Sequence, residues 1–331
     1  MLLDWSVRTP RTRCYRNGEL VDEDFPLADV SEHLAEEGCV VWVGLCSPEE
    51  ADLDLLAEEL GLHALAVEDA LKLHQRPKLD RYSDHLFLSA YSITFSPASA
   101  TVETSEIAAF ITERAFVTVH EDPEFNLDAV VARWDSSPDL ASNGVAFLLH
   151  GLLDFLVDGY FEAVEALDEQ VEELESQLFE PRSDQEAVQR RSFELRKSLV
   201  LMRRVILPMR EVVNTLLRRD VHLLPNDMAP YFQDVYDHVL RAMEWTESLR
   251  DLATSVLEAN LAIQGNRLNV ITKKVTGYAA IIAVPTAITG FYGQNVPYPG
   301  FSELGGFYSS IALIVGLSTL LYLLFKRNDW I

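Results

Sequence analysis

The chain has 331 residues and carries 52 acidic against 27 basic side chains, a formal net charge of -25. This balance disfavours a nucleic-acid partner and favours a cationic ligand. The three cysteines, Cys14, Cys39 and Cys46, form no C-x-x-C pair, which argues against a disulfide framework and a zinc–thiolate site.

Residues 1–140 predict a cytosolic α/β domain. The N-terminus has no apolar core behind a basic start, so we expect no secretory signal. Runs rich in β-branched and aromatic residues predict strands at 39–45, 85–95, 105–112 and 115–120. Between the first two strands the pattern predicts two short helices, with Ser47 as the N-cap of the first and Pro77 as the stop of the second.

Residues 141–225 predict a pair of antiparallel helices. Seven apolar residues alternate three and four positions apart and therefore share one stripe of a packed helix. They are Val157, Tyr160, Val164, Leu167, Val171, Leu174 and Leu178. The other faces of this helix are acidic, which we interpret as a solvated surface and not as a metal site. The second helix, at 184–218, is basic, and the opposite charges favour pairing.

Residues 226–274 predict a stalk helix that continues into the first of two transmembrane helices, 275–293 and 306–325. Both spans are uncharged and long enough to cross a hydrocarbon core about 30 Å thick. The alternative is two buried helices of a soluble domain. Lysines precede the first span and the tail 326–331 is basic, whereas the loop 294–305 has no Lys or Arg. The positive-inside rule thus predicts a multi-pass protein of the cell (inner or plasma) membrane with both termini cytoplasmic.

One face of the first span is made only of small or uncharged polar residues, alternately three and four positions apart. They are Asn269, Thr272, Thr276, Ala279, Ala283, Thr286, Gly290 and Gly293. One interpretation is a seam for packing against another helix. The other is the lining of an ion pathway, which needs a homo-oligomer because two spans cannot enclose a passage. The face has no ionisable residue, which disfavours a proton relay.

Several segments together resemble the CorA family of divalent cation channels. The family signature at the end of the first span is Y-G-M-N, and this chain has "YGQN" at 292–295, with two C-terminal spans and a long preceding helix. The resemblance extends upstream through "VEDALKLHQRPKLDRY" (67–82), "PYFQDVYDH" (230–238) and "NRLNVITKKVT" (266–276).

The resemblance implies an α+β/α membrane protein that assembles as a homopentameric funnel, with each first span lining a central pore. It places an asparagine ring at Asn295, beside Gly293 and Gln294, at the outer mouth. The family's pore-facing positions fall on Asn269, Thr272, Ala279, Ala283, Thr286 and Gly290. The resemblance also implies that Asp69 and Glu258 of neighbouring subunits share a regulatory Mg2+, and Asp234 matches a further acidic position.

Two residues depart from the family pattern. Gln294 replaces the signature Met, which leaves the ion preference open, and Ala283 replaces a bulky Met of the hydrophobic constriction, which can instead lie at Val275. The predicted function is a passive Mg2+ channel gated by intracellular Mg2+, with Co2+, Ni2+ or Zn2+ as other cargo. The alternatives are a zinc transporter of the related ZntB type and a non-conducting, membrane-anchored cation sensor. We find no enzyme motif.

Overall fold

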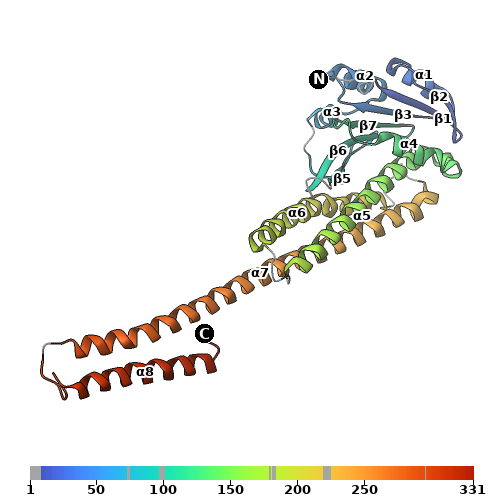
Figure 1. Cartoon of the computed structure of the whole chain (residues 1–331). Helices are drawn as coiled ribbons and strands as arrows, with labels where there is room; N and C mark the ends of the chain where they lie inside the picture. Colours follow the sequence, from blue (N-terminus) through green and yellow to red (C-terminus); the bar gives the residue numbers. More distant parts are fainter. Residues whose placement is uncertain are drawn as a thin grey trace. The chain divides into compact units, whose positions relative to one another are not determined.

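The computed structural model describes residues 9–72, 75–96, 101–178, 180, 184–218, 225–294 and 296–331. The chain divides into two compact units, Met1–Val256 and Leu257–Ile331 (Figure 1). Helix α7 (Ala229–Tyr292) runs from the first unit into the second, and each unit is described by itself.

A seven-stranded mixed sheet organises the first unit, in the order β2-β1-β3-β7-β6-β5-β4. Only β3 and β7 are parallel neighbours, and every other pair is antiparallel. The strands are β1 (Arg11–Arg16), β2 (Glu19–Glu23), β3 (Cys39–Cys46), β4 (Lys78–Arg81), β5 (Leu86–Ser96), β6 (Thr101–Ile111) and β7 (Ala115–His120). The four predicted strands are confirmed as β3, β5, β6 and β7.

Short helices cover one face of this sheet. They are η2 (Leu27–Asp29), α1 (Val30–Ala35), α2 (Glu50–Leu60) and α3 (Ala64–Leu71). Val30, Leu53, Leu56 and Val67 from these elements join Val43 and other strand residues in one buried cluster. Burial of this apolar surface is the main free-energy term that holds the helices on the sheet.

Two predicted helix boundaries are wrong. The N-cap of α2 is Glu49, whose side chain forms a reciprocal capping box with Asp52. Ser47 lies upstream of the helix with a φ of 48°, and its hydroxyl donates to the carbonyl of Glu121. Helix α3 ends at Leu71, well before Pro77, because the backbone leaves the helical region at Lys72.

Long helices pack on the opposite face of the sheet. After α4 (Leu127–Asp135) and η3 (Pro138–Asn143), α5 spans Val145–Leu178 and α6 spans Gln185–Leu216. All seven residues of the predicted apolar stripe of α5 are buried, and the hydroxyl of Tyr160 donates to the carbonyl of Tyr91 on β5 at 2.7 Å. Figure 1 shows α5 and α6 side by side and antiparallel, as the sequence predicts.

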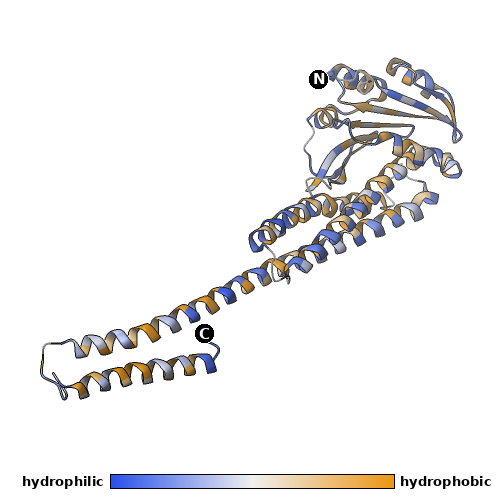
Figure 2. Cartoon of the chain, viewed as in Figure 1, coloured by the Kyte–Doolittle hydropathy of each residue, from blue (hydrophilic) through white to orange (hydrophobic). Residues whose placement is uncertain are grey.

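The second unit contains the end of α7 and a second apolar helix. A short 3-10 helix, η4 (Asn226–Met228), precedes α7, and α8 spans Leu304–Arg327. The most apolar windows of α7 and α8 are long enough to span a bilayer, yet only 6% and 0% of their residues are buried. Figure 2, in which the ribbon is coloured by hydropathy, shows hydrophobic residues along α8 and the end of α7. Such a large exposed apolar surface indicates contact with lipid or with other protein chains.

Candidate functional site

The apolar end of α7 packs on α8 and the C-terminal residue through one face. A Cβ added to Gly277 would lie 3.1 Å from Cγ1 of Ile331, so this face admits very little extra volume. Ile281, Val284 and Ile288, at helical spacing from Gly277, are partly buried on the same side. The α7 side of this contact is therefore a glycine beside partly buried aliphatic residues, and Phe325 of α8 lies 3.7 Å from the same Cβ position.

The face of small and polar residues points away from that contact. All of its members are exposed in the single chain, and a Cβ added to Gly290 would meet no atom within 4 Å. The residues are Asn269, Thr272, Thr276, Ala279, Ala283, Thr286, Gly290 and Gly293, and Val275, the alternative position of the constriction, is exposed beside them. This face is thus not the seam that holds α8, and it is available to another chain or to solvent. We call it the free stripe.

A third face of α7 carries large apolar side chains. Ile271, Tyr278 and Ile282 are 56%, 52% and 66% exposed. They have no cover within the described residues of the second unit, and they suit a hydrocarbon environment. The helix therefore presents three distinct surfaces: one against α8, one with large apolar side chains, and the free stripe.

Aromatic rings organise the turn after α7. Gly293 and Gln294 close the helix by donating their backbone N–H groups to Thr289 and Phe291. The hydroxyl of Tyr298 donates to the carbonyl of Tyr292 at 3.1 Å, and their ring centroids lie 5.0 Å apart. Asn295, predicted to form the ring at the outer mouth, lies outside the described residues. Tyr298 lies about one turn beyond the end of the helix, where its hydroxyl satisfies a carbonyl that has no partner within the helix.

Asp69, the predicted regulatory residue, lies on α3 in an ion pair. Its carboxylate is 2.6 Å from the ammonium of Lys78, which also lies 2.7 Å from Asp80. Burial lowers the pKa of Lys78, but the hydrogen bonds to Asp69 and Asp80 outweigh this effect and raise it. A metal ion at Asp69 would therefore compete with a fixed, fully charged lysine. Sequence patterns do not predict this ion pair, because it depends on how β4 packs beside α3.

The other two acidic positions lie on α7. Asp234 is 67% exposed and pairs with Nδ1 of His238 one turn later, at 3.3 Å. Glu258 is exposed and belongs to the second unit. Among the residues that the structure describes, no three His, Cys, Asp or Glu side chains form a metal-binding group. The structure of one chain does not bring Asp69, Asp234 and Glu258 together.

A sequence profile decides the family. The profile described as "CorA-like Mg2+ transporter protein" matches residues 37–327, most of the chain. The chain belongs to this family. The CorA-like chain is thus a divalent cation transporter of the CorA type, and its apolar helices α7 and α8 fit a membrane protein.

Individual relatives agree with that assignment. The Cobalt/magnesium transport protein CorA of Thermotoga maritima is 29% identical, over 93% of this CorA-like chain and 89% of the relative. The Zinc transport protein ZntB of Yersinia pseudotuberculosis is 24% identical over 77% of each chain. Both relatives are named as transporters, not as enzymes.

Solved structures share the fold. The complete structure of the CorA magnesium transporter from Methanocaldococcus jannaschii has a TM-score of 0.77 and covers 97% of this chain, with 22% identity. This CorA-like chain thus has the architecture of its structural neighbours: an N-terminal α/β unit, a long helix and two C-terminal apolar helices.

Proposed function

We propose that this chain is a homopentameric Mg2+ channel whose ion pathway is lined by the free stripe of α7. The observation that carries the proposal is the exposure of the stripe on the side of α7 away from α8. A second copy can meet this face without displacing α8. The small side chains leave room between copies, and the Thr and Asn side chains supply neutral hydrogen-bonding groups.

The proposed selectivity element is the ring of Asn295 at the outer mouth, with Gly293 and Gln294. Magnesium dehydrates reluctantly, so a ring of amide oxygens suits the waters of the hydrated ion better than it suits the bare ion. A neutral ring binds weakly enough to release the ion again. The membrane potential supplies the driving force, about 4.6 kcal/mol for a divalent ion at 100 mV.

The membrane topology belongs to the same proposal. The spans are 275–293 and 306–325, and the loop 294–305 faces outward from the inner or plasma membrane. Lys273, Lys274, Lys326 and Arg327 flank the spans on the cytoplasmic side, together with both termini. The cytoplasmic part comprises 1–140, the helix pair 141–225 and the stalk 226–274.

Regulation is proposed at Asp69 and Glu258 of neighbouring copies, with Asp234 as a further acidic position. Carboxylates that face each other across an interface repel one another until a divalent cation bridges them. Intracellular Mg2+ would therefore stabilise the closed pentamer, and its loss would favour opening. A metal ion that binds Asp69 must compete with the ammonium of Lys78, which forms an ion pair with the same carboxylate.

Zinc transport is the second candidate, and the same pathway would carry Co2+ or Ni2+ if the mouth admits them. Gln294 in place of the signature Met favours a changed ion preference, and one relative is named as a zinc transporter. An uptake assay in which Mg2+, Co2+, Ni2+ and Zn2+ compete decides which of these ions is transported. It compares the wild-type chain with Gln294→Met.

The deciding experiment is ion uptake by liposomes that contain the purified chain. We expect Mg2+ uptake that depends on the membrane potential and is lost in Asn295→Ala. The matched control is Ser302→Ala, in the same turn but beyond the signature, and it should keep wild-type uptake. Unchanged uptake in Asn295→Ala would refute the selectivity role. An absence of uptake in the wild-type chain would favour a non-conducting sensor.

A further inference from the structure

A large cavity lies in the first unit, between the sheet and α6. Its volume is about 780 Å³, and its walls come from the segment after α3, from β5 and β6, from the residues after β7 and from α6. A hydrated Mg2+ with six waters needs only about 200 Å³ at the volume of liquid water. The cavity instead has the size of a small-molecule site.

Two arginines line this cavity without a protein partner. Arg76 and Arg204 are exposed, and neither makes an ion pair or side-chain hydrogen bond within the described part of the chain. Acidic side chains outnumber basic ones 52 to 27, so internal partners are abundant. By contrast, Arg203, next to Arg204, pairs with Glu247. Two unpaired guanidinium groups in one cavity form a site for an external anion.

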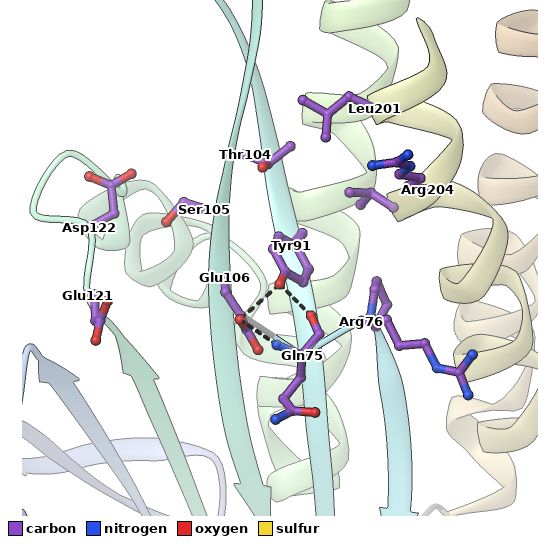
Figure 3. A pocket seen from close by; sticks show the side chains of 12 residues that line it. Gln75, Arg76, Tyr91, Thr104, Ser105, Glu106, Glu121, Asp122, Leu201 and Arg204 are labelled. Carbon is purple, nitrogen blue, oxygen red and sulfur yellow. Dashed lines mark hydrogen bonds between the residues drawn. The ribbon is translucent and has the colours of Figure 1, made fainter. Parts of the chain in front are cut away.

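The opposite side of the cavity is acidic. Figure 3 shows Glu121 and Asp122 on one side of Tyr91 and Glu106, with Arg76 and Arg204 on the other. The cavity is therefore bipolar: it offers cations to one end of a ligand and hydrogen-bond acceptors to the other end. A simple anion such as inorganic phosphate would use only half of these groups.

The floor of the cavity is held in place by a hydrogen-bond network. Glu106 is 8% exposed and accepts hydrogen bonds from the hydroxyls of Ser89 and Tyr91, at 2.8 and 2.9 Å. It also accepts one from the backbone N–H of Gln75 at 3.1 Å, and the single hydroxyl proton of Tyr91 is shared between Glu106 and the carbonyl of Gln75. Gln75 is thus held on both sides, which fixes the backbone that carries Arg76.

The same segment connects the cavity to the proposed regulatory residues. Asp69 lies on α3 just before it, and Lys78, the ion-pair partner of Asp69, begins β4 just after it. A ligand that binds Arg76 acts on the backbone between the two members of this ion pair. Binding can therefore change the distance between Asp69 and Lys78.

We propose that this cavity binds an organic phosphate of nucleotide size. The phosphate groups contact Arg76 and Arg204, and the amino or hydroxyl groups at the other end of the ligand donate to Glu121 and Asp122. Through the Gln75–Arg76 segment the ligand shifts the Mg2+ dependence of gating. This last consequence rests on the proposed channel function, whereas the binding itself does not.

The binding test uses ATP and the purified full chain in detergent, with EDTA present to remove divalent cations. Isothermal titration calorimetry should show saturable binding of one ATP per chain. Arg204→Gln and Arg76→Gln should each weaken binding by about tenfold or more. The matched control is Arg196→Gln, because Arg196 is also exposed on α6 and has no ion pair or side-chain hydrogen bond to any described residue, but does not line the cavity. It should stay within about twofold of wild type.

Three results would overturn the proposal: no saturable binding of ATP, equally tight binding of inorganic phosphate, or an equal loss of affinity in Arg196→Gln. A separate measurement of Mg2+ uptake by liposomes at fixed free Mg2+ then tests the channel function independently of ATP binding. A chain that binds ATP through Arg204 but moves no Mg2+ supports the cavity site and refutes the channel. A chain that conducts Mg2+ but binds no ATP refutes only the cavity site.

Discussion

At the scale of single residues, the pairing of Asp69 with Lys78 is the feature with the most direct bearing on regulation. The side chains of Asp69 and Lys78 are partly buried, with 28% and 25% of their surface exposed, so solvent screens their attraction only in part. The ammonium of Lys78 therefore competes with a metal ion for the carboxylate of Asp69. A carboxylate that is neutralised by a lysine binds a metal ion less tightly than a free one. Under the proposed regulation, Lys78 therefore sets the Mg2+ concentration at which Asp69 responds.

Replacement of Lys78 by Gln should increase the sensitivity of the channel to intracellular Mg2+. We expect half-inhibition of uptake at a concentration about three- to tenfold lower, equivalent to ~0.7–1.4 kcal/mol of removed competition. Uptake by liposomes loaded with a series of Mg2+ concentrations measures this shift. Lys72→Gln is the control, because Lys72 pairs with the more exposed Glu68 on the same helix. An unshifted midpoint in Lys78→Gln would show that Asp69 does not sense Mg2+.

A buried histidine makes the stability of the first unit dependent on pH. His85 is 3% exposed between Tyr82 and Phe110, and neither ring nitrogen has a hydrogen-bond partner within the described residues. Burial lowers the pKa of His85 below the ordinary value of 6.5, with a smaller contribution from His63. The unfolded chain then binds more protons than the folded one below about pH 6.5, so stability falls as the pH falls.

His85→Phe should remove part of this acid sensitivity. Phenylalanine keeps the ring stacking and needs no hydrogen bond, so the fall in melting temperature between pH 7.5 and pH 5 should shrink by about 2–4 °C. Thermal unfolding followed by the fluorescence of the buried Trp42 and Trp134 measures it. His33→Phe is the contrast, because a backbone hydrogen bond to Asp29 and the carboxylate of Asp22 raise the pKa of His33. If His85→Phe and wild type lose equal stability in acid, His85 is not responsible.

At the scale of elements, two glycines inside long helices have opposite roles. A Cβ on Gly151 of α5 would lie 2.5 Å from the ring of Trp134, which is fixed by a hydrogen bond to the carbonyl of Leu148 and by contact with Trp42. A Cβ on Gly265 of α7 would meet no atom within 4 Å. The first glycine is required by packing, and the second only weakens its helix.

Gly151→Ala should therefore destabilise the first unit by about 1–3 kcal/mol through overpacking. Gly265→Ala should stabilise its helix by about 0.5–1 kcal/mol, because alanine loses less backbone entropy on folding. Thermal unfolding of the two variants, compared with wild type, measures both effects. Equal behaviour of the two variants would contradict the packing argument for Gly151.

The elements that sequence patterns predict are those with a buried apolar face. Strands β3 and β7 consist largely of buried apolar residues, and their runs are visible in the sequence. Strands β2 and β4, at the two edges of the sheet, have mostly polar sequences and were missed, as was β1, in which arginines alternate with buried residues. Edge strands carry charges that prevent further pairing, so they lack the apolar signal that identifies a strand.

At the scale of the whole molecule, the candidate site was only partly accessible from sequence. The residues of the free stripe recur with the period of a helix, so the sequence predicts that they share one face of α7. The sequence does not predict which face of α7 contacts α8. The partner of Asp69 and the cavity beside Arg204 depend on contacts between segments far apart in the chain. Local patterns do not report such contacts.

The exposed faces of α7 predict which of its residues line the proposed ion pathway. Thr286 lies on the stripe, whereas Ile282 lies on the face with large apolar side chains and is 66% exposed. A cationic thiosulfonate reagent in water should therefore modify Thr286→Cys and block uptake, and it should leave Ile282→Cys active. The free cysteines Cys14, Cys39 and Cys46 are replaced by serine in both variants. A block in Ile282→Cys alone would exchange the roles of the two faces.

Mixing the chains then counts them. We assume that one modified thiol is enough to close a pathway. In an equal mixture of Thr286→Cys and unsubstituted chains, the reagent then leaves active only the fraction of assemblies in which every chain is unsubstituted. This fraction is about 3% for five chains and about 12% for three, so the residual flux discriminates the pentamer from smaller rings. A residual flux near one half would mean that each chain conducts alone. That result would refute a pathway formed between copies, and with it the premise that two spans in one chain cannot enclose a passage.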